Sequence, residues 1–224
     1  MPRRLNSLPR FAHALLGVLI SATLVASGVR AEGLPPPTGP VAPRVAPIND
    51  DGHYRQRWYH VSFLDLREDF LEAKAEDMRF AVIFEQQGCI YCKRMHTEVM
   101  SRKYINDYVR RNFRILQLNL WGAREVTDFD GKRMTEKKLA ERWGVIFTPT
   151  VVFFKDDLTG LDGKWGRELE ATERLPLSFG PDTFYDLFVW VRHKIYLQDR
   201  NFQRFHLARS DERDALRMRS SEKR

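Results

Sequence analysis

Two cysteines three positions apart are the residues of this sequence with the clearest chemical potential. They are Cys89 and Cys92, in the run Gly88-Cys89-Ile90-Tyr91-Cys92, and the chain contains no other cysteine. At the start of a helix, free N–H groups and the helix dipole stabilise a thiolate, which is the attacking species in thiol–disulfide exchange. The spacing therefore predicts Cys89 as the nucleophile and Cys92, one turn inside the helix, as the resolving thiol.

The residues around the two cysteines bear on three other roles, namely haem attachment, metal binding and a structural disulfide. A c-type haem requires a histidine directly after the second cysteine, where Lys93 stands. Zinc or copper could be bound by Cys89, Cys92 and His96, with a fourth ligand from elsewhere in the chain. A purely structural disulfide over so short a loop stabilises little. We therefore expect redox chemistry, with no metal and no cofactor beyond the Cys89–Cys92 disulfide, and keep a metal-binding chaperone as an alternative.

A proline ahead of an apolar run forms the second motif. The run Gly144-Val145-Ile146-Phe147-Thr148-Pro149-Thr150 precedes the strand expected at 151–154, and a proline is tolerated best at the head of a strand. We interpret the Thr148–Pro149 bond as cis, which would present the Thr148 backbone to an extended substrate segment. An ordinary trans strand entry is the alternative.

The segments around these motifs alternate between helical and strand patterns. The order predicts an α/β fold with a mixed central sheet flanked by helices. Helices are expected at 65–78, 89–100, 104–110, 135–143 and from Pro181, strands at 80–84, 113–120 and 151–154, a loop at 121–132, a turn at 156–163, and a possible hairpin partner at 165–169.

The start of the chain has the pattern of an export signal. Arg3, Arg4 and Arg10 precede an apolar run at 14–26, and small residues follow near Ala31. Removing residues 1–31, which contain four arginines and no acid, lowers the formal net charge from +7 to +3. We therefore expect a periplasmic protein cleaved near Ala31, without a nucleic-acid partner; an uncleaved membrane anchor is the alternative.

Two further segments flank the expected domain. Residues 32–50 are rich in proline and are predicted to be an extended linker. Residues 198–224 are predicted to be a basic tail that continues a helix onto the domain and then frays. The intervening residues 51–197 are the expected globular domain.

Two stretches of the sequence carry a resemblance to a known family. They are Phe84-Glu85-Gln86-x-Gly88-Cys89-x-Tyr91-Cys92-x-x-Met95-His96 and Gln117-Leu118-Asn119-x-Trp121-Gly122-x-Arg124-Glu125-Val126-Thr127-Asp128-Phe129. They resemble the SoxW-type periplasmic thioredoxins of the thioredoxin superfamily, over about residues 58–154. The resemblance implies a thioredoxin-like fold, to which the expected helix of the tail adds a C-terminal helical extension. It also implies Cys89 as attacking thiol, Cys92 as resolving thiol and Pro149 as the cis-proline.

The resemblance also implies partners. Such proteins receive electrons from a membrane thiol transporter of the CcdA type and pass them to periplasmic protein disulfides, among them a sulfur-carrier protein of thiosulfate oxidation. A reductant that keeps such a partner thiol reduced is the expected function. Cytochrome c maturation, and general disulfide isomerisation or repair, are alternatives that use the same chemistry.

The site region departs from ordinary thioredoxins. Ile83 occupies the position of their buried aspartate, so Glu85 is a candidate proton acceptor for Cys92, or else an exposed residue at a strand end. His96 could tune a thiol or be a partly buried side chain. Ile90, Tyr91 and Thr148 are expected to shape the substrate-binding rim.

Overall fold

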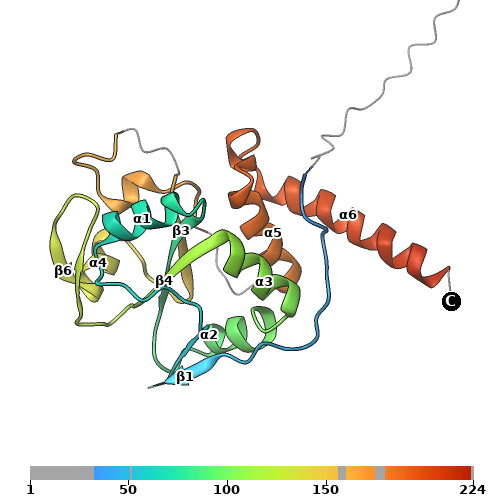
Figure 1. The fold of residues 1–224 in the computed structure, drawn as a ribbon, viewed down its shortest axis with the longest axis horizontal. Coiled ribbons are helices and arrows are strands. Elements are labelled where there is room, and N and C mark those ends of the chain that lie inside the picture. Colours follow the sequence, from blue (N-terminus) through green and yellow to red (C-terminus); the bar gives the residue numbers. More distant parts are fainter. Residues whose placement is uncertain (1–32, 51, 156–159, 175–179, 223–224) are drawn as a thin grey trace, which may run out of the picture. The chain divides into compact units, whose positions relative to one another are not determined.

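The computed structural model describes residues 33–50, 52–155, 160–174 and 180–222 (Figure 1). Residues 1–33 and 34–224 are separate units, and the expected export signal lies outside the described residues. Within the described ranges, no helix combines the length and apolar character needed to cross a membrane.

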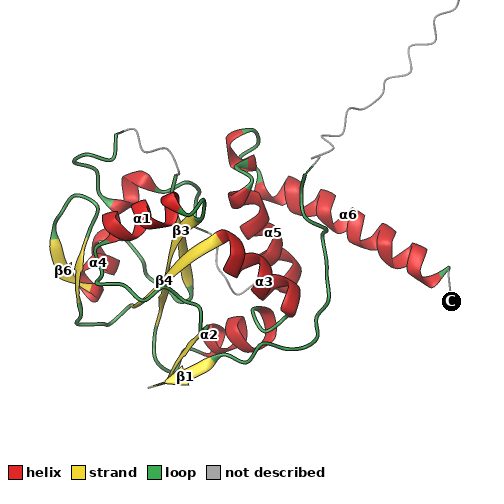
Figure 2. Cartoon of the chain, viewed as in Figure 1, coloured by secondary structure: helices red, strands yellow, loops and turns green. Residues whose placement is uncertain are grey.

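The strands are short apart from two central ones, and the helices follow the predicted order (Figure 2). The strands are β1 (Ile48–Asp50), β2 (His53–Arg55), β3 (Arg79–Glu85), β4 (Phe113–Asn119), β5 (Glu125–Thr127), β6 (Arg133–Thr135) and β7 (Thr150–Phe153). The helices are α1 (Leu66–Ala75), α2 (Ile90–Arg94), the π-helix η1 (Met95–Val99), α3 (Lys103–Asn112), α4 (Glu136–Trp143), the 3₁₀ turns η2 (Gly166–Leu169) and η3 (Ile195–Leu197), α5 (Pro181–Arg192) and α6 (Phe202–Ser221).

The central sheet has the order β4-β3-β7. Strand β4 runs parallel to β3, with Ile83 opposite Gln117, and β7 runs antiparallel to it, with Ile83 opposite Val151. All seven residues of β3 are buried. These observations confirm the predicted α/β fold with a mixed sheet.

Helices cover both faces of this sheet, which explains why β3 is apolar without alternation (Figure 1). On one face, Ala81 and Ile83 of β3 pack with buried residues of η1, α3 and α5. On the other face, Phe80, Val82 and Phe84 pack with buried residues of α1 and α4.

Residues at the helix ends act as the caps and helix starts that are typical of their residue types. Asp65 accepts hydrogen bonds from the first turn of α1, and Thr135 caps α4 through the N–H of Lys138. Gly144 ends α4 with φ +67°, a conformation that glycine adopts without steric cost. Pro181 opens α5, as predicted.

Residues 121–132 are not the simple loop that was expected, because they contribute to the β5–β6 hairpin. The hairpin buries Val126 and Phe129 against the α1–α4 side of the core. Asp128, itself fully buried, accepts hydrogen bonds from the Trp143 indole and from the N–H of Gly166. The tertiary contacts of Val126, Phe129 and Asp128 therefore order this segment, although most of its residues are polar.

The prediction that residues 165–169 form a hairpin strand is wrong. Gly166–Leu169 forms a 3₁₀ turn, and only an isolated bridge joins Phe154 to Glu170. A Cβ added at Gly166 would lie 2.0 Å from the ring of Trp143. The turn therefore fits closely over the buried tryptophan, where a strand residue with a side chain would clash. Part of the expected turn at 156–163 lies outside the described residues.

The proline-rich segment is packed on the domain and is not a free spacer. Its carbonyl groups at Pro40 and Val41 accept hydrogen bonds from the N–H groups of Tyr104 and Lys103, in the first turn of α3. The N–H of Val45 donates to the carbonyl of Ser101. Backbone carbonyls of residues 34–47, which we call the strap, thus satisfy N–H groups that a helix start leaves unpaired.

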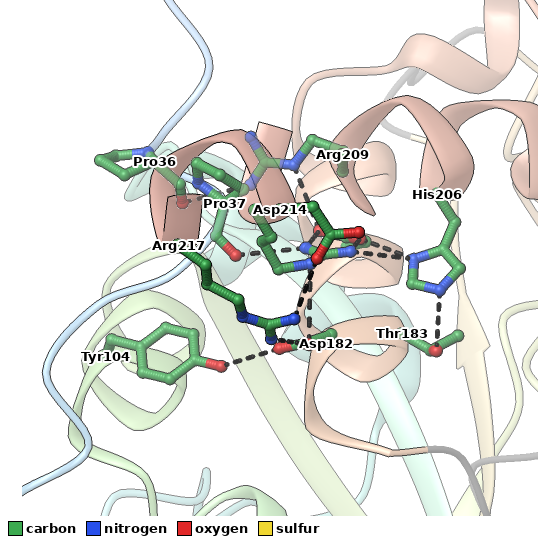
Figure 3. Close-up of polar contacts among 11 residues, drawn as sticks. Pro36, Pro37, Tyr104, Asp182, Thr183, His206, Arg209, Asp214 and Arg217 are labelled. Carbon is green, nitrogen blue, oxygen red and sulfur yellow. Dashed lines mark hydrogen bonds and ion pairs between the residues drawn. The ribbon is translucent and has the colours of Figure 1, made fainter. Parts of the chain in front are cut away.

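The expected basic tail is also largely ordered, as the twenty-residue helix α6. Two of its arginines, Arg209 and Arg213, are 3% exposed and form ion pairs with the fully buried Asp186 of α5. The same arginines donate to strap carbonyls at Pro35, Pro36 and Pro37, of which Figure 3 labels Pro36 and Pro37. The hydrophobic and charge pattern of the tail alone did not predict this buried cluster.

Asp186 is expected to be essential for the attachment of α6 and the strap. Replacing Asp186 by Ala leaves two buried arginines without their shared carboxylate, so we expect a loss of about 3–5 kcal/mol in the free energy of unfolding, measured by urea denaturation. Asp214→Ala, which removes only an exposed pair with Arg217, is the matched control and should cost about 0–1 kcal/mol. Equal effects of the two changes would contradict this account.

Candidate redox site

The two cysteines lie where β3 ends and α2 begins, and they form a disulfide. Gly88 makes the connecting turn with φ +72°, and Cys89 is the N-cap residue of α2. The sulfur of Cys89 accepts a hydrogen bond of 3.0 Å from the N–H of Cys92. Cys89 is half-buried, whereas Cys92 is only 2% exposed.

The Thr148–Pro149 segment faces the cysteine pair. The Oγ1 hydroxyl of Thr148 lies 3.4 Å from the sulfur of Cys89, and the Thr148 carbonyl oxygen lies 3.7 Å from it. The Thr148–Pro149 peptide bond is cis. The antiparallel pairing of β7 with β3 brings these segments together although 59 positions separate them in the sequence.

Apolar side chains surround this pair of segments. Ile90 and Tyr91, between the cysteines, are 64% and 52% exposed, and Ile146 and Phe147 precede Thr148 with 84% and 42% exposure. Such exposure of large apolar side chains at a reactive disulfide is typical of a docking surface for polypeptide. We call these four residues the rim.

Trp121 is a residue to which the sequence analysis gave no role of its own. It lies two positions beyond the end of β4 and is 63% exposed, and its indole N–H donates to the Gln86 side chain over 2.9 Å. The carbonyl of Gln86 in turn accepts from the N–H of Cys89. Its position just beyond the end of a predicted strand was the available signal, since parallel strands end at one edge of a sheet.

Glu85 and His96 form a buried pair beneath the disulfide-bearing helix. Glu85 is 1% exposed and His96 is fully buried, and the His96 Nε2 atom lies 2.9 Å from a carboxylate oxygen of Glu85. The other ring nitrogen of His96 lies 3.2 Å from the amide nitrogen of Gln56. Neither the exposed strand end considered for Glu85 nor the partly buried position considered for His96 is correct.

This pairing bears on the alternatives for the site. Both ring nitrogens of His96 are engaged within the core, so His96 does not point to the two sulfurs as a third ligand. The hydrogen bonds of Glu85 among the described residues go to His96 and not to a cysteine. The negative charge of Glu85 and burial together raise the pKa of the neighbouring Tyr59 well above its usual value, with burial the larger cause.

The arrangement suits thiol–disulfide exchange. The half-buried sulfur of Cys89 is the reachable atom, and the helix start holds an N–H group against it that stabilises a thiolate. The buried sulfur of Cys92 is close enough for ring closure and shielded from other reactants. Hydrogen bonds and burial therefore give the two cysteines different roles.

Part of the chain is similar to known proteins. Residues 66–163 match the model of the thioredoxin-like domain family, whereas no curated protein matches the sequence. One similar solved structure is a thioredoxin-fold protein from Helicobacter pylori, with 18% sequence identity, 60% of this chain and 86% of that chain covered, and a TM-score of 0.49. Another is a thioredoxin from Thermus thermophilus, with 23% identity, 55% of this chain and 81% of that chain covered, and a TM-score of 0.42. A third is a DsbH oxidoreductase, with 14% identity, 70% of this chain and 96% of that chain covered, and a TM-score of 0.39.

The matched region includes both cysteines, Thr148 and Pro149. The Cys89–Cys92 disulfide therefore lies in a thioredoxin-like region, as expected for a thiol–disulfide oxidoreductase.

Proposed function

We propose that the chain acts as an exported reductant of protein disulfides. The observation that carries the proposal is the difference between the two sulfurs: Cys89 is reachable and accepts the Cys92 N–H, while Cys92 is buried behind it. The rim and the Thr148 backbone beside Cys89 support an extended polypeptide as the substrate. Thr148 and Pro149 would then bind the substrate backbone, and Ile90 and Tyr91 its side chains.

The reaction follows from these positions. The Cys89 thiolate attacks one sulfur of the substrate disulfide, forms a mixed disulfide and releases the other substrate sulfur as a thiolate. The Cys92 thiol then loses its proton and attacks the Cys89 sulfur, which restores the Cys89–Cys92 disulfide and releases the second substrate thiolate. The two electrons gained by the substrate come from the cysteine pair, which an external dithiol donor must reduce again.

We assign Glu85 a positioning role in the second step. His96 follows Cys92 by four residues on the same helical run, so both side chains lie on its buried side. Glu85 holds His96 there over 2.9 Å, and the pair would accept the proton of the buried thiol. Glu85 would act through His96, which differs from the direct contact expected from the sequence.

The proposal extends from the chemistry to the compartment, the electron donor and the substrate. The export pattern of residues 1–31 supports a periplasmic site, and the resemblance to SoxW-type thioredoxins supports a CcdA-type transporter as electron donor and a sulfur-carrier protein as substrate. Under this proposal the chain keeps the carrier thiol reduced during thiosulfate oxidation. Purification of the natural mixed disulfide would separate this role from cytochrome c maturation and from disulfide repair.

Trapping tests the roles of the cysteines. Cys92→Ser should accumulate mixed disulfides through Cys89, because the resolving thiol is missing, and these should be seen as reducible adducts in non-reducing electrophoresis. Cys89→Ser is the matched control and should form few or none. In the reduced wild-type protein, brief alkylation should modify Cys89 before Cys92; the opposite order would reverse the assignment.

The Glu85 role is tested by a substitution of nearly equal shape. Glu85→Gln keeps a hydrogen-bond acceptor for His96 but removes the negative charge, so we expect slower release of a preformed mixed disulfide and an altered pH profile of that step. Single-turnover measurements from pH 5 to 9 provide the readout. Glu98→Gln, at an exposed ion pair with Arg94, is the control. An unchanged pH profile in Glu85→Gln would assign Glu85 a purely structural role.

Export is tested on the mature protein. Mass spectrometry of the periplasmic fraction should find an N-terminus near Glu32, because the small residues before it are suited to signal peptidase. Full-length chain that stays in membranes after carbonate extraction would contradict cleavage.

A further inference from the structure

A cavity of about 1180 Å³ lies along the outer edge of β4, apart from the rim. It is bounded by β4, by the β1–β2 hairpin with the chain that follows it, and by the loop at 122–124. Its volume exceeds the 300–1,000 Å³ of most small-molecule sites. A ligand of several residues would fit there.

Strand β4 borders this cavity and is the edge strand of the central sheet. The residues whose backbone faces away from β3 are Ile115, Gln117 and Asn119. The carbonyl of Ile115 accepts from the N–H of His60, the carbonyl of Gln117 accepts from the Arg124 guanidinium over 3.4 Å, and the N–H of Asn119 donates to Glu136. No strand among the described residues pairs with this edge, and the N–H of Gln117 lies between these occupied groups. An N–H group at a sheet edge can donate to an extended segment that lies along it.

The chain that could cover the edge turns away from it. After His60, the next residues leave the sheet, and Val61 and Phe63 are 93% and 104% exposed. Leu64 follows with φ +68°. Apolar side chains are therefore exposed at the border of the cavity.

The charge of the lining is positive. Arg55, Arg57 and Arg124 line the cavity, and the one acid among the described lining residues, Glu136, is 1% exposed and paired with Arg124. Arg57 is exposed and has no ion pair in the described part of the chain. The Nε2 atom of His53, another lining residue, is buried without a hydrogen-bond partner there. Buried polar atoms usually have a hydrogen-bond partner, and a bound ligand would supply one for His53.

We propose that this cavity, which we call the β4 groove, docks an extended acidic segment of the partner protein. A hydrogen bond from the Gln117 N–H would hold the segment, Arg57 would select acidic side chains, and Val61 and Phe63 would cover its apolar side chains. This inference rests on the proposed function for the identity of the partner as a disulfide-bearing protein.

The groove leads toward the redox site. Asn119 and Gly122 line it on either side of Trp121, whose indole is bonded to Gln86 next to Cys89. A segment paired with β4 can thus continue past Trp121 to the reachable sulfur. Recognition in the groove would raise the local concentration of the partner disulfide at Cys89.

Binding of two labelled peptides tests the proposal. One is a nonapeptide alternating glutamate and valine, and the other alternates lysine and valine; fluorescence anisotropy at low salt measures both. The wild-type chain should bind the glutamate peptide about tenfold more tightly, and Arg57→Glu should remove most of that preference. Arg200→Glu, at an exposed arginine outside the groove, makes the same charge change and should keep it.

Amide hydrogen exchange locates the peptide. The Gln117 N–H should gain protection when the glutamate peptide is bound, because it would then donate across the new strand pair. Equal affinity for both peptides, retention of the preference in Arg57→Glu, or no added protection at Gln117 would overturn the proposal. Displacement of the peptide by sulfate without such protection would assign the groove to small anions and would overturn it as well.

A reductase assay run in parallel keeps the two proposals separate. If the wild-type chain reduces a small aromatic disulfide while the peptides bind equally, only the docking inference fails. If it reduces neither that disulfide nor insulin, the proposed function fails whatever the peptides do.

Discussion

The burial of β3 on both faces is the constraint on which the arrangement of the site depends. Because helices pack on each side of this strand, its direction and register are fixed by the core, and the turn at Gly88 must deliver Cys89 to the same sheet edge each time. The pairing of β7 with β3 then places Thr148 against the Cys89 sulfur. The reactive atoms are thus positioned by the most rigid part of the domain.

Polar groups inside the domain connect distant parts of the chain to this core. Asp186 binds two arginines of α6, and these arginines hold the strap, whose further carbonyls cap α3. The chain then reaches Gln56, which contacts His96 beneath the redox helix. The buried charges of Asp186, Arg209 and Arg213 are paired with one another, which is the condition for placing such groups in a core. The strap and α6 therefore complete the core around a domain that would otherwise expose α3 and α5.

Chemistry and recognition are separated in this molecule. The disulfide lies at a helix start with one reachable sulfur, and the apolar rim beside it offers little sequence discrimination. Under the docking proposal, the β4 groove supplies what the rim lacks, namely positive charge and an N–H group at a strand edge. Differences in partner choice among thioredoxin-like proteins can arise at such an edge without any change in the cysteine environment, since affinity and reactivity then depend on different residues.

The sequence by itself determined the elements and the reactive pair. A continuous apolar run predicted β3, helical spacing of apolar residues predicted α1, residues typical of helix ends predicted α4 and α5, and cysteine spacing predicted the disulfide, because each of these signals is local. Only the tertiary structure decided that Glu85 faces His96, that Trp121 stands beside the redox turn, that β5 and β6 pair, and that the strap and α6 meet on Asp186. Those outcomes depend on side chains brought together from positions far apart in the chain, and composition and periodicity carry no record of which distant partner satisfies a buried polar group.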